Sequence, residues 1–177
     1  NGMGTGNLVL LTLVLAGMMS IDMGGPFNKA AYVFASGAFA NDPKSTTAAI
    51  LMAAVMVGGM VPPFATAIGT AFFKNKYTED ERRAGVTNWI LGFSFITEGA
   101  IPFATADPGR VIPSCIIGSA VSGAIVGAMR IGIPAPHGGF WVSPLATNIW
   151  GYFLAVIVGS IVAALIMSFW KKPVNEK

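Results

Sequence analysis

The stretch "TTAAILMAAVMVGGMVPPFATAIGTAFF", from Thr46 to Phe73, contains 28 residues and no charge. A helix needs about 20 apolar residues to cross roughly 30 Å of hydrocarbon, so this run is long enough to span a bilayer. Pro62 and Pro63 lack backbone donors, and we expect a kink or a broken helix there. The stretch therefore predicts an all-α protein built from transmembrane helices.

The composition of the whole chain supports a membrane protein. Among 177 residues, 54% are hydrophobic and 11% are charged, whereas soluble domains carry roughly 25% charged residues. The net charge of +3 does not indicate nucleic-acid binding, because the basic residues form short clusters between apolar runs. One cysteine and one histidine exclude a disulfide framework and a Cys/His metal site built from this chain alone.

Further spans are predicted on both sides of the first one. Val111 to Met129 is uncharged and carries small residues that let a neighbouring helix approach closely. Ile149 to Trp170 is the clearest crossing, and Leu8 to Ile21 can end a span that begins nearer the first residue. Phe27 to Ala40 is a short, marginal apolar run.

Charged loops predict the orientation. The segment "KNKYTEDERR", Lys74 to Arg83, is the most polar part of the sequence, and we expect it to be an aqueous loop. Its four Lys and Arg residues favour the cytoplasmic side, and Lys171 and Lys172 place the C-terminal end on the same side.

Two stretches remain, about 86–106 and about 131–148. Counting crossings does not distinguish full spans from segments that enter and return. Pro134, Pro136 and Pro144 break a helical ladder, and a span over 131–148 leaves almost no residues to turn before Ile149. We therefore expect two re-entrant hairpins that enter from opposite faces and bring their tips together near the midplane.

Glu98 is the one carboxylate in the first of these hairpins. A carboxylate at the centre of a membrane helix costs about 3 kcal/mol, so it is usually retained for a partner or a function. One interpretation is pairing with a distant basic residue or a place at an aqueous interface; the other is a polar anchor in a substrate cavity. Thr97, Thr105 and Asn88 add neutral hydrogen-bonding groups that suit a hydroxyl-rich ligand.

His137 is the candidate in the second hairpin. Its neutral ring offers one donor and one acceptor, and Gly138 lets the backbone approach a ligand. The alternative is a structural histidine bonded to a carbonyl in a Pro-Gly turn. Trp89 and Trp141 lie in the two hairpins and are candidates for stacking on a sugar ring, whereas Trp150 and Trp170 suit the membrane interface.

Other polar residues have mainly structural interpretations. An Asp22–Lys29 ion pair is expected to fix the Gly-Gly-Pro turn, with Asn28 as a possible substrate contact. Asp107 and Arg110 are expected to pair, although Arg110 could instead meet a phosphorylated partner. Cys115 has no basic neighbour in the sequence and is expected to be a packing residue.

Four motifs together resemble a known family. The motifs are "DMGGPFNKAAY" (Asp22 to Tyr32), "MVPPFATAIGT" (Met60 to Thr70), "FITEGAIPFATADPGRVIPS" (Phe95 to Ser114) and "APHGG" (Ala135 to Gly139). Their order and spacing resemble the fructose family of phosphoenolpyruvate-dependent sugar phosphotransferase permeases, the membrane subunit called enzyme IIC. The resemblance covers nearly the whole chain and implies the C-terminal, substrate-holding half of that subunit.

The resemblance implies a fold and a mechanism. The fold is a single transport domain over residues 1–177, like that of the glucose-superfamily enzyme IIC, in the bacterial cytoplasmic membrane and homodimeric in the full-length protein. It binds fructose or a related hexose, moves it by an elevator-like motion, and presents it to a cytoplasmic domain that carries a phosphocysteine. The resemblance implies no cofactor, and it implies that the phosphocysteine belongs to the cytoplasmic domain and is not on this chain.

The resemblance also carries over onto individual residues. The glutamate of the "ITEG" segment contacts a sugar hydroxyl in related permeases, which implies a catalytic and substrate-binding role for Glu98. For His137 the order differs, because in the glucose branch the sugar-contacting histidine precedes the glutamate. An alternative from another class is a proton- or cation-coupled secondary transporter or channel in which Glu98 titrates or binds the ion; such a relay usually needs more than one carboxylate.

Overall fold

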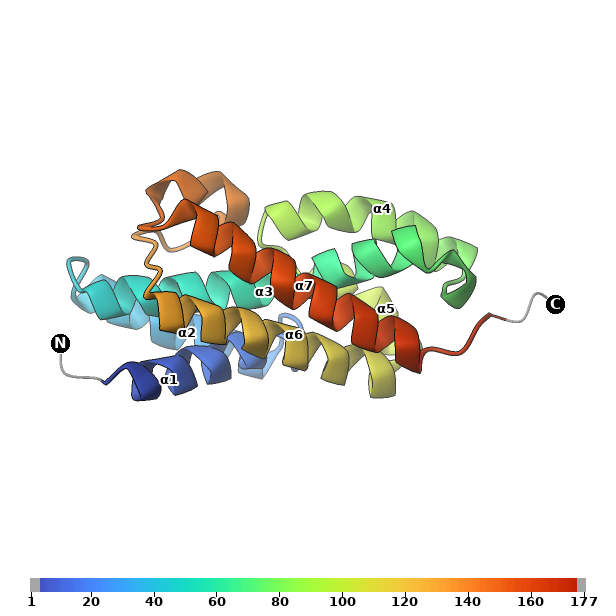
Figure 1. Cartoon of the computed structure of the whole chain (residues 1–177), viewed down its shortest axis with the longest axis horizontal. Coiled ribbons are helices and arrows are strands. Elements are labelled where there is room, and N and C mark those ends of the chain that lie inside the picture. The colour runs from blue at the N-terminus through green and yellow to red at the C-terminus, as the bar shows by residue number, and fades with distance from the viewer. Residues whose placement is uncertain (1–3, 175–177) are drawn as a thin grey trace.

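The computed structural model describes residues 4–174, and every regular element in that range is helical. The α-helices are α1 (Thr5–Met18), α2 (Pro26–Asn41), α3 (Thr46–Phe72), α4 (Glu79–Phe93), α5 (Ile101–Ala106), α6 (Pro108–Met129) and α7 (Ile149–Trp170), with 3-10 turns η1 (Lys74–Lys76), η2 (Thr97–Ala100) and η3 (Gly139–Leu145). They form an elongated bundle (Figure 1). The all-α prediction is confirmed.

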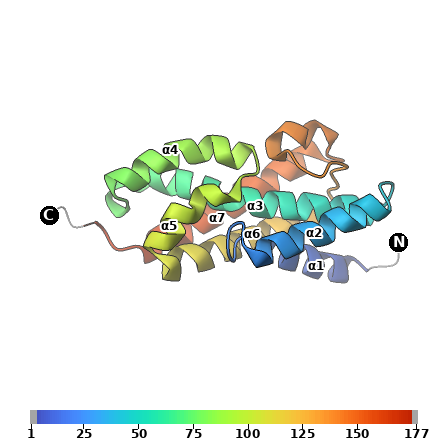
Figure 2. The same cartoon turned by 180° about the vertical axis from the view of Figure 1, so that it is seen from behind.

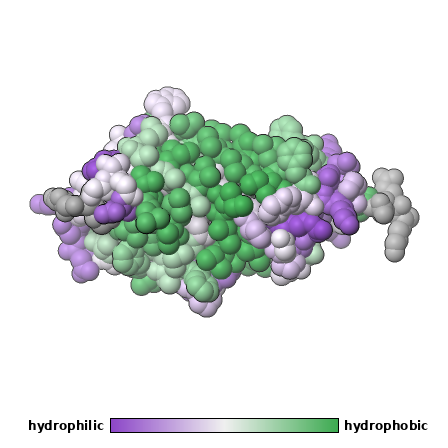
Figure 3. Space-filling view, turned by 60° about the horizontal axis from the view of Figure 1, so that its bottom comes forward, coloured by the Kyte–Doolittle hydropathy of each residue, from purple (hydrophilic) through white to green (hydrophobic). Residues whose placement is uncertain are grey.

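The surface of the bundle matches a membrane protein. Three helices, α3, α6 and α7, are long and apolar enough to cross a bilayer. In Figure 3 a broad apolar belt lies between two hydrophilic ends. Water would penalise such a belt, whereas a bilayer removes that cost.

Helix α3 is the central element, and it runs unbroken through Pro62 and Pro63. A proline removes the hydrogen bond to the carbonyl four residues earlier, which here frees the carbonyls of Gly58 and Gly59. Both find other donors. The Ser119 hydroxyl donates to the Gly58 carbonyl at 2.8 Å, and the Thr97 hydroxyl donates to the Gly59 carbonyl at 2.9 Å. The helix therefore stays whole because its neighbours supply the missing donors.

Helix α6 packs against α1 on one side and α7 on the other. The contact with α1 is backbone to backbone, since a Cβ atom on Gly123 would lie 2.3 Å from the Thr12 carbonyl oxygen. On the other side, the Ser122 hydroxyl donates to the Ala155 carbonyl of α7 at 2.6 Å. The small residues in the span thus permit the close approach that membrane helices use.

Two helix pairs extend only about half the length of the bundle. Helices α1 and α2 start and end at one end of it, and α4 and α5 at the opposite end; both turns lie near the middle (Figures 1 and 2). The apolar run that was expected to end a span at Ile21 contains α1, which ends at Met18 and does not continue along the bundle. The chain turns back through residues 19–25 instead.

Residues 131–148 form a closed loop between α6 and α7. Its base is held by two bonds, from the Gly132 amide to the Thr147 hydroxyl and from the Thr147 amide to the Gly132 carbonyl, both 3.0 Å. Its far part reaches the α4–η2 turn, where a Cβ on Gly139 would lie 2.7 Å from the Phe93 carbonyl oxygen. The loop contains η3 and no α-helix.

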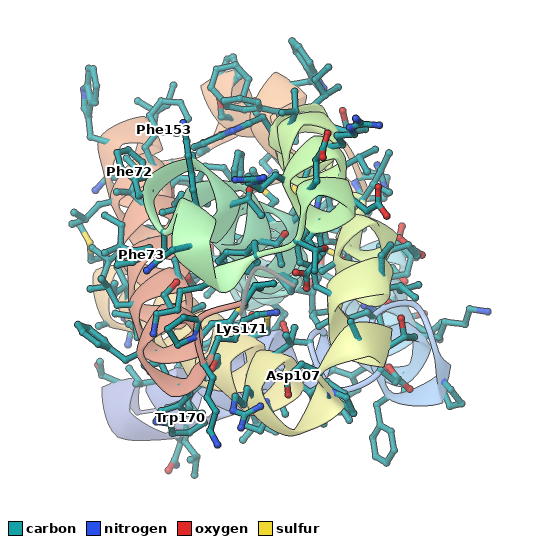
Figure 4. The ribbon with its side chains drawn as sticks, turned by 90° about the vertical axis from the view of Figure 1, so that its right-hand side faces the viewer. Phe72, Phe73, Asp107, Phe153, Trp170 and Lys171 are labelled. Carbon is teal, nitrogen blue, oxygen red and sulfur yellow. The ribbon has the colours of Figure 1, made fainter. Side chains whose placement is uncertain are left out.

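The opposite end of the bundle is closed by a buried ion pair. Figure 4 views this end, which carries Lys171 and Asp107. The Lys171 ammonium lies 2.8 Å from Glu81, with only 8% and 12% of the two side chains exposed, and 4.7 Å from the centre of the Tyr77 ring. Burial raises the pKa of Tyr77 to about 12.

The predicted loop over residues 74–83 contains η1 and the first turn of α4, where Thr78 and Glu81 form a capping box.

Candidate functional site

A cavity of about 390 Å³ lies where the two half-length pairs meet. Three parts of the chain supply its walls: the α1–α2 turn with the start of α2, the α4–η2 turn, and the tip of the 131–148 loop. The lining residues are Met19, Gly24, Asn28, Lys29, Tyr32, Phe95, Ile96, Thr97, Glu98 and His137. Of the predicted site residues, Glu98, His137, Thr97 and Asn28 are therefore brought together.

Glu98 lies in η2, on the side of the cavity formed by α4 and α5. Its side chain is exposed, and it makes no hydrogen bond or ion pair with any residue between 4 and 174. Gly24 of the opposite turn lies against it, because a Cβ at that position would be 2.7 Å from Oε1. The carboxylate is thus free to accept hydrogen bonds from a ligand.

Both turns carry strained backbone beside the cavity. Phe95 has φ of +59° and Met23 has φ of +44°, a region that bulky side chains rarely adopt. Both side chains are buried, at 6% and 2% exposure. Such strain persists only when surrounding contacts hold it in place, and it clusters at functional sites.

Asp22 has a different role from Glu98, although each precedes a Pro-Phe pair by four residues. Its carboxylate accepts from the amides of Phe27 and Asn28 at 2.8 and 2.9 Å, which stabilises the start of α2. The predicted Asp22–Lys29 ion pair is wrong, because no contact between these two side chains lies within 4.0 Å. Lys29 instead lines the cavity, with no acidic partner within 4.0 Å among the described residues.

Two of the predicted contacts also have structural bonds. Thr97 is 3% exposed and donates its hydroxyl proton to Gly59 of α3. The Asn28 amide donates to the Met19 carbonyl at 2.7 Å, which ties α2 to the end of α1. Both side chains therefore position the turns, and each keeps acceptor capacity toward the cavity.

His137 reaches the cavity from the 131–148 loop. Its ring centre lies 5.0 Å from that of Phe95, and Tyr32 supports the same loop by donating to the Pro136 carbonyl at 2.9 Å. Gly138 does not line the cavity, but its φ of +133° requires glycine and turns the chain just after the histidine.

The remaining neutral candidates lie elsewhere. Asn88 donates to Thr66 at 2.8 Å and to the Gly99 carbonyl at 2.9 Å, so it fastens η2 to α3 and α4. Thr105 is exposed and donates to carbonyls of its own helix. Trp89 and Trp141 do not line this cavity either, and the Trp141 indole donates to Ser94 at 3.3 Å.

Two structural expectations agree with the coordinates. Arg110 pairs with Asp107 at 2.9 Å where α5 meets α6, and Cys115 is fully buried in α6. Lys29, Tyr32 and Phe95 are wall residues that the sequence did not single out. The shared spacing of Asp22 and Glu98 before Pro-Phe is the signal that could have identified the first turn as a counterpart of the second.

Comparisons with known proteins identify relatives over nearly the whole chain. It is 47% identical to "Fructose permease IIC component" of Bacillus amyloliquefaciens, over 99% of this chain and 56% of that protein. It is 47% identical to "PTS system fructose-specific EIIABC component" of Bacillus subtilis, over 99% of this chain and 27% of that protein. It is 45% identical to "PTS system fructose-specific EIIC component" of Haloferax volcanii, over 100% of this chain and 46% of that protein.

These similarities confirm the resemblance that the four motifs indicate. The chain spans between about a quarter and just over half of the length of these relatives. No family model and no solved structure matches it.

Proposed function

We propose that this chain, a homologue of part of the fructose-specific EIIC permease subunit, holds and translocates the sugar in a phosphotransferase system. The observation that carries the proposal is the unpaired Glu98 carboxylate in a cavity between two half-length helix pairs. Transporters bind their substrates at such positions, near the bilayer midplane between broken helices. A volume of about 390 Å³ lies within the range of roughly 300–1,000 Å³ for small-molecule sites.

The proposed orientation has the Lys171 end in the cytoplasm and the membrane normal along the bundle. Seven Lys and Arg residues lie at that end, namely Lys74, Lys76, Arg82, Arg83, Arg110, Lys171 and Lys172; the opposite end carries Lys44 and Arg130. Basic residues favour the cytoplasmic side. The α4–α5 pair then acts as the re-entrant hairpin expected over about 86–106. The α1–α2 pair enters from the opposite face and takes the place of the hairpin expected over about 131–148, which is a loop between α6 and α7.

The cavity chemistry suits a polyol. Glu98 accepts hydrogen bonds, the Lys29 ammonium donates them, and the neutral His137 ring does both. A sugar hydroxyl is both donor and acceptor, so it can bond to each of these groups. The proton- or cation-coupled alternative is less well supported, because Glu98 is the only carboxylate among the lining residues and a lysine lies with it.

The proposed phosphoryl transfer uses this arrangement. The phosphate comes from a phosphocysteine on a cytoplasmic domain: its P–S bond breaks, the thiolate stays on that domain, and a P–O bond forms to the sugar hydroxyl. Glu98 accepts the hydroxyl proton late in the reaction and passes it to water. Because the transition state is loose, positioning and charge stabilisation supply most of the catalysis.

The test measures fructose phosphorylation by the full-length permease reconstituted with its phosphorylated cytoplasmic domain. Loss of a hydrogen bond to a charged group is worth about 1.5–3 kcal/mol, so Glu98→Gln should reduce kcat/KM by about 10- to 150-fold. Glu79→Gln, an exposed carboxylate of α4, is the control and should retain activity. Wild-type kinetics in Glu98→Gln would refute the proposal, as would uptake driven by a proton gradient without sugar phosphate.

A further inference from the structure

A second hollow is lined by residues of α3, α4 and α7, and both α4 and α7 pack against α3. Its volume is about 530 Å³ and it shares no lining residue with the cavity around Glu98. We call it the apolar groove; its walls include Phe64, Trp89, Phe93, Phe153, Ile157 and Ile161. Several of these side chains are more than a third exposed, so the groove opens to the surroundings of the bundle.

A basic pocket of about 450 Å³ adjoins the groove. It lies between the end of α3 and the start of α4, and Lys74 and Arg82 provide its charge. Neither cation has an Asp or Glu partner within 4.0 Å among the described residues. Trp89 lines both the pocket and the groove, which makes them neighbours.

The helical periodicity shows that the two hollows follow one face. On α3 the lining positions are 60, 64, 67, 68, 70 and 71, on α4 they are 82, 85, 86, 89 and 93, and Lys74 lies in η1. Steps of three and four residues keep side chains on the same side of a helix. From position 60 to position 71 the rise of α3 is about 16 Å, close to half of a hydrocarbon core of about 30 Å, and Lys74 follows just beyond the end of this helix.

We propose that this continuous site binds an anionic phospholipid. The phosphate contacts Lys74 and Arg82 at the basic end of the bundle, and one acyl chain lies along the apolar groove. The two cations without partners select negative charge, while the aromatic and aliphatic walls select hydrocarbon. Because α4 and α7 form opposite walls of the groove, the bound acyl chain fills the space between α7 and the α4–α5 pair.

The experiment measures lipid retention on the full-length protein in detergent by native mass spectrometry. Dioleoyl phosphatidylglycerol is the probe and dioleoyl phosphatidylcholine the neutral comparison. Each basic residue near a membrane surface contributes about a fivefold factor, so Lys74→Gln with Arg82→Gln should weaken phosphatidylglycerol retention about 30-fold. The matched control is Arg83→Gln, which removes the neighbouring cation that pairs with Glu79 and should leave retention unchanged.

The acyl-chain part has its own variant. Ile157→Trp fills the apolar groove and should weaken retention, whereas Leu165→Trp, an exposed residue of the same helix outside the groove, should not. Excess inorganic phosphate should fail to displace the lipid. Equal retention by the double variant and the wild type would overturn the proposal, and so would full displacement of the lipid by phosphate. A third contradicting result is that Ile157→Trp disrupts assembly while lipid retention is unchanged, because a second copy or another part of the protein would then occupy the groove.

Discussion

Replacing Thr97 by valine tests how the α4–α5 pair is held against the central helix. The Thr97 hydroxyl donates to the Gly59 carbonyl, which lost its helical partner to Pro63. Valine keeps the shape and removes the donor. The carbonyl is then buried without a partner, which costs about 1–3 kcal/mol. The free energy of unfolding in detergent, measured by denaturant titration, should fall by that amount.

A second substitution separates this cause from general disturbance. Pro63→Ala restores a backbone N–H that can donate to the Gly59 carbonyl within α3, so Thr97→Val should cost less in the Pro63→Ala background. The difference between the two costs is the coupling energy of a double-mutant cycle. Thr105→Val serves as a control because that hydroxyl is exposed and bonds within its own helix. Equal costs of Thr97→Val in both backgrounds would refute the reasoning.

Three further predictions concern the turns and the closed end. Gly24→Ala places a Cβ against Glu98 at a φ of +106°, so fructose affinity measured by calorimetry should fall at least tenfold, whereas Gly37→Ala, with nothing within 4 Å, should leave it unchanged. Lys171→Met leaves Glu81 buried without its partner and should lower the free energy of unfolding by about 3–5 kcal/mol, against less than about 1 kcal/mol for exposed Arg83→Met; equal costs would contradict the buried pair. The pKa of Tyr77 is raised from 10.0 to about 12, so the folded state holds the phenol proton more tightly than the unfolded state. Its contribution to the free energy of unfolding is therefore complete below pH 10 and is lost between pH 10 and 12. Tyr77→Phe should flatten the decline of the free energy of unfolding over that interval, and an unchanged slope would show that another group causes the decline.

The long spans could be predicted because hydropathy reports the length of an apolar run. Ile149 to Trp170 was predicted with the bounds of α7, and the run from Thr46 ends one residue beyond α3. The small residues of α6 also indicated close packing, which the contact between Gly123 and Thr12 displays. These properties are local to one helix, and the sequence alone therefore contains them.

The half-length first pair could not be predicted in the same way. Apolar composition does not tell where a helix ends, and α1 ends at Met18, before the chain turns back into α2. The role of Asp22 depends on amides five and six residues later, which meet its carboxylate only once α2 has formed. One of the two interpretations of the sequence placed Glu98 in a cavity, but the neighbours Gly24 and Lys29 come from a segment more than 65 residues away.

The unbroken helix at Pro62 and Pro63 is another result of tertiary structure. Local rules predict a kink or a break, because two carbonyls lose their donors. The structure supplies replacements from Ser119 and Thr97, which lie on two other elements. The two prolines therefore mark a place where neighbouring elements must donate hydrogen bonds to the freed carbonyls of α3. One of those donors, Thr97, immediately precedes Glu98.

The central claim is that Glu98 binds the sugar between the two opposed turns. The most direct measurement is a cryo-EM or crystal structure of the full-length protein with fructose bound. We predict sugar density in the cavity lined by Lys29 and His137, with a hydroxyl within hydrogen-bonding distance of the Glu98 carboxylate. Fructose bound at another place, or Glu98 held in an ion pair with no sugar beside it, would contradict the account.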